Sequence, residues 1–328
     1  MSNNRDGLVQ HVRQWIARHN IEENALLIAG VSGGMDSMVL AECLHRSGVR
    51  LHVAHVNYHL RDEASDADQA HVERACMAWG VPCEILHSNV TRTDHGIQAE
   101  ARNIRYNYFQ RLRDEAQQRD SKPAYIVTAH HSDDQAETVL LHLMRSADPL
   151  TLAAMPDLDA ERGLLRPFLT LSQADLAVAC KNWGVAYRED DSNAKPDYLR
   201  NRIRHEVLPL LETLRPGTKE HVARWADRFN SLRSYLTIEI EMGKARCWKL
   251  KEKTGDLDLT DWRTEPLRLE ILHKLAHEHG IAARALPELI HLTEAHVDSG
   301  AHFLCASARV ERRGKTLHWI SLTGPLCH

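Results

Sequence analysis

The sequence of 328 residues lacks any run of eighteen apolar residues, so no membrane-spanning helix is predicted. The first residues, Met1 to Asp6, lack the apolar stretch of a secretory signal peptide. The 7 cysteines are odd in number and never form a C-x-x-C pair, as expected for free thiols in a reducing compartment. Neither charge dominates, because 41 Lys and Arg face 45 Asp and Glu, which excludes an all-over basic coat but allows a local basic patch. We therefore expect a soluble, cytoplasmic protein.

Short apolar runs alternate with helical patterns over the first two thirds of the chain. Expected strands are 25–31, 51–56, 83–87 and 124–129. Expected helices are 7–19, 36–46, 66–79, 97–119 and 134–145. Strands that alternate with helices are typical of a doubly wound α/β domain with a mostly parallel sheet, whose ligands bind at the carboxyl ends of the strands.

A second domain is predicted beyond a change in composition near Arg215-Pro216-Gly217. One long helical pattern leads away from there, followed by helical patterns near 266–278 and 287–297 and β-like runs at 302–311 and 316–322. The expected domains are therefore 1–215, of the α/β class, and 219–328, a smaller α+β domain.

The segment between the first apolar run and its helix has the composition of a phosphate-binding loop. It reads Ser32-Gly33-Gly34-Met35-Asp36-Ser37. Two glycines let the backbone approach a ligand closely, and the free N–H groups of the following helix attract anions. No lysine is present, so this is not a Walker A loop. A carboxylate among phosphates needs a cation between them, so Asp36 predicts Mg²⁺. A plain strand-to-helix turn is the alternative interpretation.

Further motifs follow the later strands. They are His55-Val56-Asn57-Tyr58-His59-Leu60-Arg61, Glu100 to Tyr106, Thr128 to Thr138, Asp190 to Asn193, and Arg200-Asn201-Arg202-Ile203-Arg204-His205. With the loop, in this order and spacing, they resemble the tRNA(Ile)-lysidine synthetase family of N-type ATP pyrophosphatases, the PP-loop superfamily. The resemblance is dense over about residues 24–215 and weak beyond.

This resemblance implies an adenine nucleotide α-hydrolase-like catalytic domain that uses ATP and Mg²⁺. The family adenylates C2 of the wobble cytidine of CAU-anticodon tRNA(Ile), releases pyrophosphate, and lets L-lysine displace AMP. The expected class is a ligase that forms a C–N bond. Expected partners are this tRNA, L-lysine and a second copy of the chain in a homodimer. The 219–328 domain is expected to bind tRNA or substrate.

The resemblance also implies roles for particular residues of this sequence. Asp36, His130, Asp134 and Arg105 are expected to be catalytic, with Asp36 and Asp134 on the metal. Ser32, Gly33, Gly34, Met35, Asp36, Ser37, His55 and Arg61 are expected to bind the nucleotide, and Arg102, Arg200, Arg202 and Arg204 the RNA. The alternative interpretations are core packing for His130, solvent exposure for the arginines, and a helix N-cap role for Asp133.

Two departures from the family pattern leave other functions open. Residues 146–155 contain no glycine where the family usually carries a glycine-rich stretch, so we expect this loop to follow another path. The segment His55 to Arg61 lacks one usual carboxylate and one usual glycine. The rival hypotheses are a PP-loop enzyme that thiolates RNA, one that adenylates a small molecule, and a catalytically silent nucleotide- or tRNA-binding protein.

Overall fold

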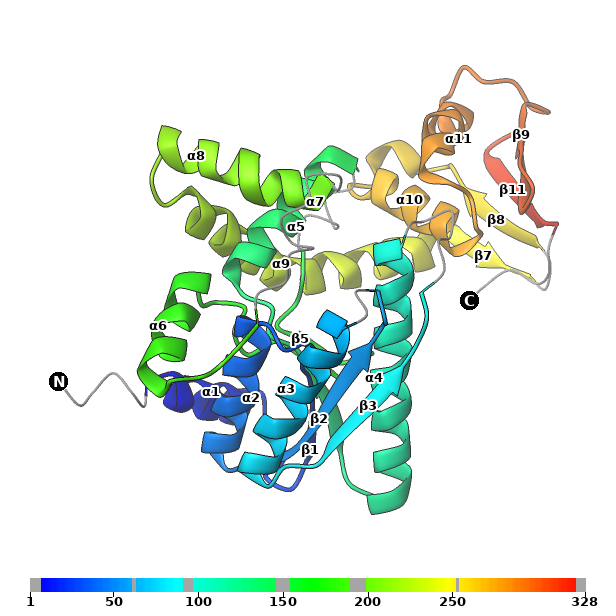
Figure 1. Ribbon diagram of the computed structural model, residues 1–328. Coiled ribbons are helices and arrows are strands. Elements are labelled where there is room, and N and C mark those ends of the chain that lie inside the picture. Colours follow the sequence, from blue (N-terminus) through cyan, green and yellow to red (C-terminus); the bar gives the residue numbers. More distant parts are fainter. Residues whose placement is uncertain are drawn as a thin grey trace. The chain divides into compact units, whose positions relative to one another are not determined.

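A computed structural model describes residues 7–60, 63–90, 97–145, 154–188, 199–251 and 254–322 (Figure 1). Arg61, the motif at 190–193 and most of the glycine-free segment, 146–153, lie outside these ranges. The chain divides into two compact units, Met1–Asn230 and Ser231–His328. The boundary predicted near 215–219 lies at the start of the long helix α9 (Thr218–Cys247), whereas this division falls within that helix.

The first unit is built on a six-stranded sheet in the order β3-β2-β1-β4-β6-β5. The strands are β1 (Leu26–Gly30), β2 (Arg50–Asn57), β3 (Cys83–His87), β4 (Ala124–Val127), β5 (Leu158–Asp159) and β6 (Leu164–Leu165). All pairings are parallel except that of β5 with β6. The predicted doubly wound, mostly parallel sheet is confirmed, although the short β5 and β6 were not expected.

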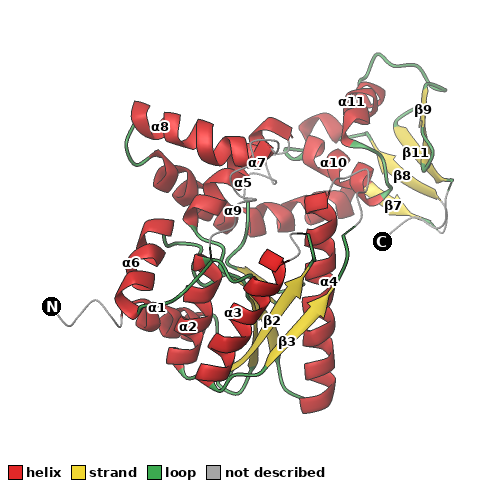
Figure 2. Ribbon diagram, viewed as in Figure 1, coloured by secondary structure: helices red, strands yellow, loops and turns green. Residues whose placement is uncertain are grey.

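Helices cover both faces of this sheet (Figure 2). Successive residues of each strand point to opposite sides, so each strand packs against helices on both faces. Leu27 and Ala29 pack with α1 (Gly7–Arg18), α2 (Met35–Ser47), α3 (Glu63–Trp79) and α6 (Gln173–Trp183). Leu26 and Ile28 pack with α4 (Ile97–Asp120) on the other face. This burial on both faces explains why the strands appear in the sequence as continuous apolar runs.

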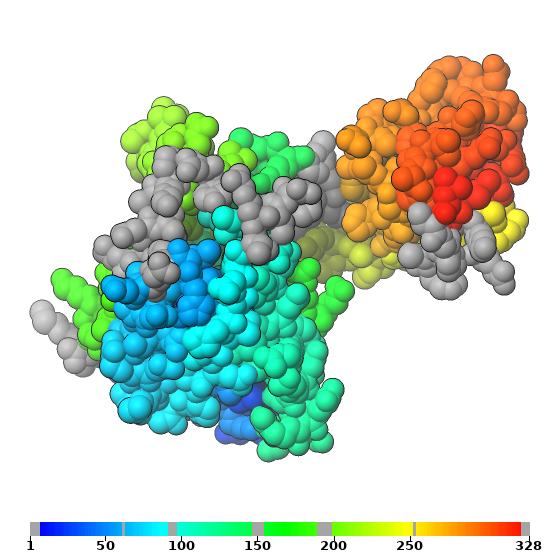
Figure 3. All heavy atoms as spheres, turned by 45° about the vertical axis from the view of Figure 1, so that its right-hand side comes forward, coloured from blue at the N-terminus to red at the C-terminus, as the bar shows by residue number. Residues whose placement is uncertain are grey.

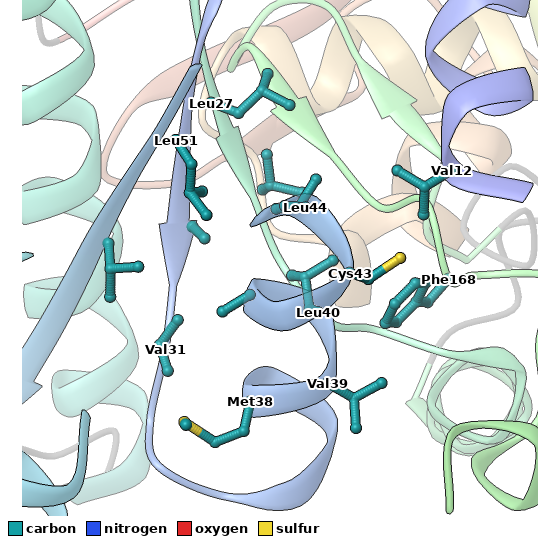
Figure 4. Close-up of a cluster of buried hydrophobic side chains, with 14 of the residues drawn as sticks. Val12, Leu27, Val31, Met38, Val39, Leu40, Cys43, Leu44, Leu51 and Phe168 are labelled. Carbon is teal, nitrogen blue, oxygen red and sulfur yellow. The ribbon is translucent and has the colours of Figure 1, made fainter. Parts of the chain in front are cut away.

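The helix after the phosphate loop is held by contacts on two of its sides (Figure 4). Leu40 and Leu44 lie toward the sheet, while Val39 and Cys43 face Phe168 and the opening helix α1. All four α2 side chains are at most 1% exposed. The position of the loop relative to the sheet is therefore set by a rigid, fully packed helix.

Local sequence signals mark both ends of α6. Ser172 and Asp175 form a reciprocal capping box at its start, and Gly184 ends it with a left-handed φ of 67°. The remaining helices of this unit are α5 (Ser132–Arg145), α7 (Leu199–Arg202), a π-helical turn (Ile203–Val207) and α8 (Leu208–Leu214).

The second unit contains the end of α9 and a five-stranded antiparallel sheet in the order β7-β8-β11-β10-β9. Its strands are β7 (Trp248–Leu250), β8 (Thr254–Asp258), β9 (His302–Leu304), β10 (Ala308–Arg313) and β11 (Thr316–Ser321), and its helices are α10 (Arg268–Glu278) and α11 (Leu286–Thr293), with single 3₁₀ turns at Trp262–Thr264 and Ala283–Ala285. Trp248, His279 and Trp319 pack edge to face in its core. In Figure 3 the atoms of β8 to β11, coloured yellow to red, form one compact mass. The predicted long helix and α+β class are confirmed, whereas β7 and β8 were not expected.

Among the described helices, none combines the length and apolar character needed to cross a bilayer.

Candidate functional site

The phosphate loop, defined here as Ser32–Ser37, joins the carboxyl end of β1 to the start of α2. The backbone N–H of Ser32 donates to Ser37 Oγ at 3.1 Å, and Ser37 Oγ donates to the carbonyl of Gly34 at 2.9 Å. Gly33 has a φ of +94°, which a residue with a side chain rarely adopts. Within the described part of the chain no side chain caps α2 at Gly34, so the N–H groups of its first turn can bind an anion.

Asp36 lies in the first turn of α2, where its carboxylate meets groups from the end of β4. Its Oδ2 is 3.5 Å from His131 Nε2, and the same nitrogen is 3.4 Å from Asp134 Oδ2. Burial by itself would lower the pKa of His131, but the carboxylates of Asp133, Asp36 and Asp134 raise that pKa to about 10. His131 is therefore an imidazolium that lies between two carboxylates and reduces their mutual repulsion.

These two carboxylates fit the Mg²⁺ that the sequence predicts. Among the residues that the structure describes, none forms a hydrogen bond with the buried Asp36 Oδ1, so this oxygen is available to a cation. Within the described ranges no three His, Cys, Asp or Glu residues gather as a complete protein metal cage. Mg²⁺ is usually held by one or two carboxylates together with substrate phosphates, and this arrangement offers two carboxylates beside the phosphate loop.

A buried acid on α5 anchors two of the predicted RNA-binding arginines. Glu137 is 1% exposed and accepts from Arg200 Nε at 2.7 Å and from Arg204 Nε at 2.5 Å. Both guanidinium groups also donate to Asp134 Oδ1 at 3.1 Å. Asp134 is consequently ionised, because burial alone would raise its pKa, yet the neighbouring histidines and arginines lower it. The π-helical turn at Ile203–Val207 places Arg204 in this network.

Asp133 serves a different helix from the one that was predicted. It lies inside α5, which begins at Ser132, so it is not the N-cap of its own helix. Its Oδ1 accepts from the backbone N–H of Gln173 at 3.1 Å, at the start of α6, and its Oδ2 accepts from Lys219 Nζ at 3.0 Å. Asp133 therefore links three helices around the site.

A cavity of about 790 Å³ lies along the phosphate loop at the carboxyl ends of the strands. The predicted catalytic residues Asp36, Arg105, His130 and Asp134 all line it, together with Arg204. His130 Nδ1 is 2.8 Å from Thr128 Oγ1, and burial lowers its pKa to about 3, so the ring is neutral. The fold thus gathers residues from β1, α2, α4, the segment after β4, α5 and the π-helical turn around one ligand-sized space.

Other predicted site residues lie elsewhere. His55 is buried in β2, where its Nδ1 is 2.8 Å from the carbonyl of Val31, so it supports the loop without lining the cavity. Arg202 is exposed and pairs with Glu206 at 3.1 Å. Arg102 lies over the ring of Tyr106, with 4.8 Å between the guanidinium carbon and the ring centroid.

The structure adds residues around the loop to which the sequence assigned no role. Arg188 donates its backbone N–H to the carbonyl of Gly33 at 3.0 Å and its Nε to Asp68 at 2.5 Å, which connects the segment after α6 to the loop. Tyr58 and Tyr106 line the cavity. Glu137 belongs to the 128–138 motif and lies on the same helix face as Asp134.

Comparisons with known proteins identify the family to which the chain is similar. A family model described as a PP-loop domain matches residues 7–211. A tRNA(Ile)-lysidine synthase of Bacillus licheniformis is 38% identical over 224 residues, which are 66% of this chain and 44% of that protein. A tRNA(Ile)-lysidine synthase of Porphyromonas gingivalis is 29% identical over 322 residues, which are 96% of this chain and 68% of that protein. The chain thus spans less than half of the first relative.

Among solved structures, the U34-tRNA thiolase NcsA of Methanococcus maripaludis, solved with its [4Fe-4S] cluster, aligns with a TM-score of 0.55 at 18% identity. The alignment covers 68% of this chain and 78% of the thiolase. At this identity the likeness establishes a shared fold and carries no functional conclusion.

Proposed function

This chain belongs to the PP-loop domain family of ATP-binding proteins, and we propose on that premise that it ligates L-lysine to C2 of the wobble cytidine of a CAU-anticodon tRNA(Ile). ATP would be cleaved between its α and β phosphates, and AMP and pyrophosphate would be released. The curated relatives named tRNA(Ile)-lysidine synthase support this substrate choice. The observation that carries the chemistry is the unsatisfied Asp36 carboxylate, which lies in an uncapped phosphate loop opposite Asp134.

The phosphate loop would bind the β and γ phosphates with its backbone N–H groups and the hydroxyls of Ser32 and Ser37. Asp36 and Asp134 would hold Mg²⁺, which when bound neutralises charge on the phosphates. Arg204, fixed by Glu137, lines the cavity and would offset the charge that develops at the α phosphate.

The proposed reaction has two displacements. In the first, the cytidine C2 oxygen attacks the α phosphorus, and the bond to the β-phosphate oxygen breaks to release pyrophosphate. In the second, the neutral ε-amine of lysine attacks C2, the C–O bond to AMP breaks, and the amine loses a proton to solvent. Neither step requires a covalent enzyme intermediate, so the chain's residues bind, orient and neutralise charge.

RNA contacts in this proposal come from exposed arginines. Arg202 is exposed, and among the described residues its ion pair is with the exposed Glu206 of its own segment, so it can turn to an RNA phosphate. In the second unit, Arg312 is buried against the carbonyls of Leu292 and Glu294, so it stabilises the fold and is not offered to RNA.

We propose that the second unit helps to select the tRNA in the cytoplasm.

The test is to measure pyrophosphate and AMP release from ATP and Mg²⁺, with labelled lysine, in the presence and absence of a CAU-anticodon tRNA(Ile) transcript. We expect release that depends on this tRNA, with label entering the RNA. Asp36→Ala should abolish release, whereas Asp66→Ala, which removes a carboxylate from α3 outside the cavity, should leave it intact.

Other outcomes would support the rival functions. Turnover with tRNA but without lysine incorporation would indicate a different nucleophile, such as a sulfur donor. Turnover without tRNA would indicate a small-molecule acceptor. ATP binding without turnover under any condition would indicate a silent binding protein.

A further inference from the structure

A second cavity in the first unit shares no lining residue with the cavity along the phosphate loop. It has a volume of about 390 Å³ and is enclosed by α2, α3 and the segment that follows α6. Sites for small ligands occupy roughly 300–1,000 Å³, so this space can hold a molecule of about the size of one nucleotide. Nothing in the proposed reaction uses it.

Two tryptophans give this cavity flat aromatic walls. Trp79 is the last residue of α3, and Trp183 is the last residue of α6. His45 of α2 stacks on Trp79, with 6.0 Å between the ring centroids and 23° between the ring planes. The guanidinium of Arg46 lies over Trp183, 5.1 Å from the ring centroid. A basic side chain of α2 therefore holds each ring in place, and fixed aromatic rings favour a flat ligand that stacks on them.

The charged side chains that line the cavity match the two ends of a nucleotide. Arg74 of α3 is exposed, and among the described residues none forms an ion pair or a hydrogen bond with it, so its guanidinium is available to a phosphate. Glu42 of α2 is 8% exposed, and its Oε1 accepts from Arg46 Nε at 2.5 Å, which fixes the carboxylate at the cavity wall. A carboxylate accepts hydrogen bonds from the N–H groups of an amino-bearing base.

Contacts within the chain form the walls of the cavity before any ligand binds. His71 Nε2 of α3 donates to the carbonyl of Ala186 at 2.9 Å, and Arg188 Nε donates to Asp68 of α3 at 2.5 Å. Both contacts attach the segment after α6 to α3. A ligand would therefore lose little free energy in ordering the site.

We propose that this cavity binds a purine nucleotide whose base carries an amino group, such as guanosine monophosphate (GMP). The base would stack on Trp79 and Trp183, its N–H groups would donate to Glu42, and its phosphate would pair with Arg74. The nucleotide is either free in solution or part of an RNA chain, and both sources present the same chemistry. An aromatic amino acid carries similar charges but is smaller, so it would leave more of the cavity unfilled.

The experiment is isothermal titration calorimetry of the full chain with GMP and with guanosine, which lacks the phosphate. The phosphate-loop cavity is first saturated with Mg²⁺ and α,β-methylene-ATP, which cannot be cleaved between its α and β phosphates. We expect GMP to bind at one further site. Arg74→Gln should weaken GMP binding by roughly 3- to 10-fold and leave guanosine binding unchanged, because it removes only the phosphate contact.

Two further variants separate stacking from charge. Trp79→Leu should weaken the binding of GMP and of guanosine alike, by roughly 10-fold, because stacking does not depend on the phosphate. Arg119→Gln removes a 67% exposed guanidinium from α4 that lines neither cavity, and it should change no affinity. Unchanged binding of α,β-methylene-ATP in each variant would show that the fold is intact.

Competition with a tRNA(Ile) transcript identifies the source of the nucleotide. Displacement of GMP by the transcript would assign the site to a nucleotide of the RNA. Simultaneous binding of GMP and the transcript would assign the site to a free nucleotide.

The proposal has outcomes that would overturn it. These are an absence of GMP binding once α,β-methylene-ATP is bound, and GMP binding that Arg74→Gln and Trp79→Leu leave unchanged. Binding of L-tryptophan in place of GMP would assign the cavity to an aromatic amino acid and would overturn the proposal as well. Each of these results, together with pyrophosphate release that depends on tRNA, would leave the proposed function standing.

Discussion

Replacing Glu137 with glutamine tests whether the buried acid on α5 organises the arginine segment at 199–207. The change keeps the side-chain volume and removes one charge from a group that is 1% exposed. The wild-type carboxylate accepts three hydrogen bonds, from Arg200 Nε at 2.7 Å, Arg204 Nε at 2.5 Å and Arg204 Nη2 at 3.0 Å. A glutamine amide offers one acceptor oxygen and turns a donor toward a guanidinium.

The expected cost follows from this geometry. Removing one partner of a fully buried ion pair costs about 3–5 kcal/mol of unfolding free energy. Arg200 and Arg204 are 34% and 33% exposed and keep Asp134 as a second acceptor, so part of that cost is recovered by water. We therefore expect Glu137→Gln to lower the stability of the first unit by about 2–3 kcal/mol, or about 5–10 °C in its thermal midpoint.

The assay combines calorimetry with hydrogen exchange. Amides of residues 199–207 should exchange faster in Glu137→Gln protein than in wild-type protein, since their anchoring charge is lost. Glu206→Gln is the matched control, because it removes a carboxylate–arginine contact that is 50% exposed, and it should cost less than about 1 kcal/mol. Equal thermal midpoints and equal exchange in wild-type and Glu137→Gln protein would refute the argument.

Three other outcomes are expected. Gly30→Ala should lower the stability of the first unit by about 1–3 kcal/mol in urea unfolding, because its Cβ would lie 2.5 Å from the ring of Phe109, and an unchanged urea midpoint would contradict this. In the second unit, burial opposes ionisation of Asp256, but the hydrogen bond from His318 helps to lower the pKa of Asp256. The ionised pair therefore stabilises the folded state at pH values above the ordinary pKa of Asp. This stabilisation is lost as the pH falls through the lowered pKa. Asp256→Asn should therefore flatten the acid limb of the unfolding curve below about pH 4, and an unaltered limb would argue against the pair. Burial raises the pKa of the Cys43 thiol to about 12, so iodoacetamide at pH 8 should label it only after denaturation, as mass spectrometry can show.

The sequence by itself determined the features that depend on neighbouring residues. Apolar runs such as Leu26 to Gly30 must be buried on both faces, which indicates a parallel sheet. The six residues of the phosphate loop are contiguous, so their glycines, hydroxyls and carboxylate come together with only a strand and a helix to place them. The start and end of α6 likewise depend on the local signals of Ser172 and Gly184.

The tertiary structure alone decided which distant charges meet. Glu137 and Arg204 are 67 residues apart, and only the packing of α5 against the π-helical turn joins them. Arginine on a helix face has the same sequence pattern whether water or a buried acid neutralises it, so Arg202 and Arg204 could not be distinguished in advance. Arg166 follows a strand of only two residues, which is too short to produce a period in the sequence, so its burial to 3% exposure could not be predicted. Local periodicity therefore determines elements, whereas the partners of buried charges are determined by long-range packing.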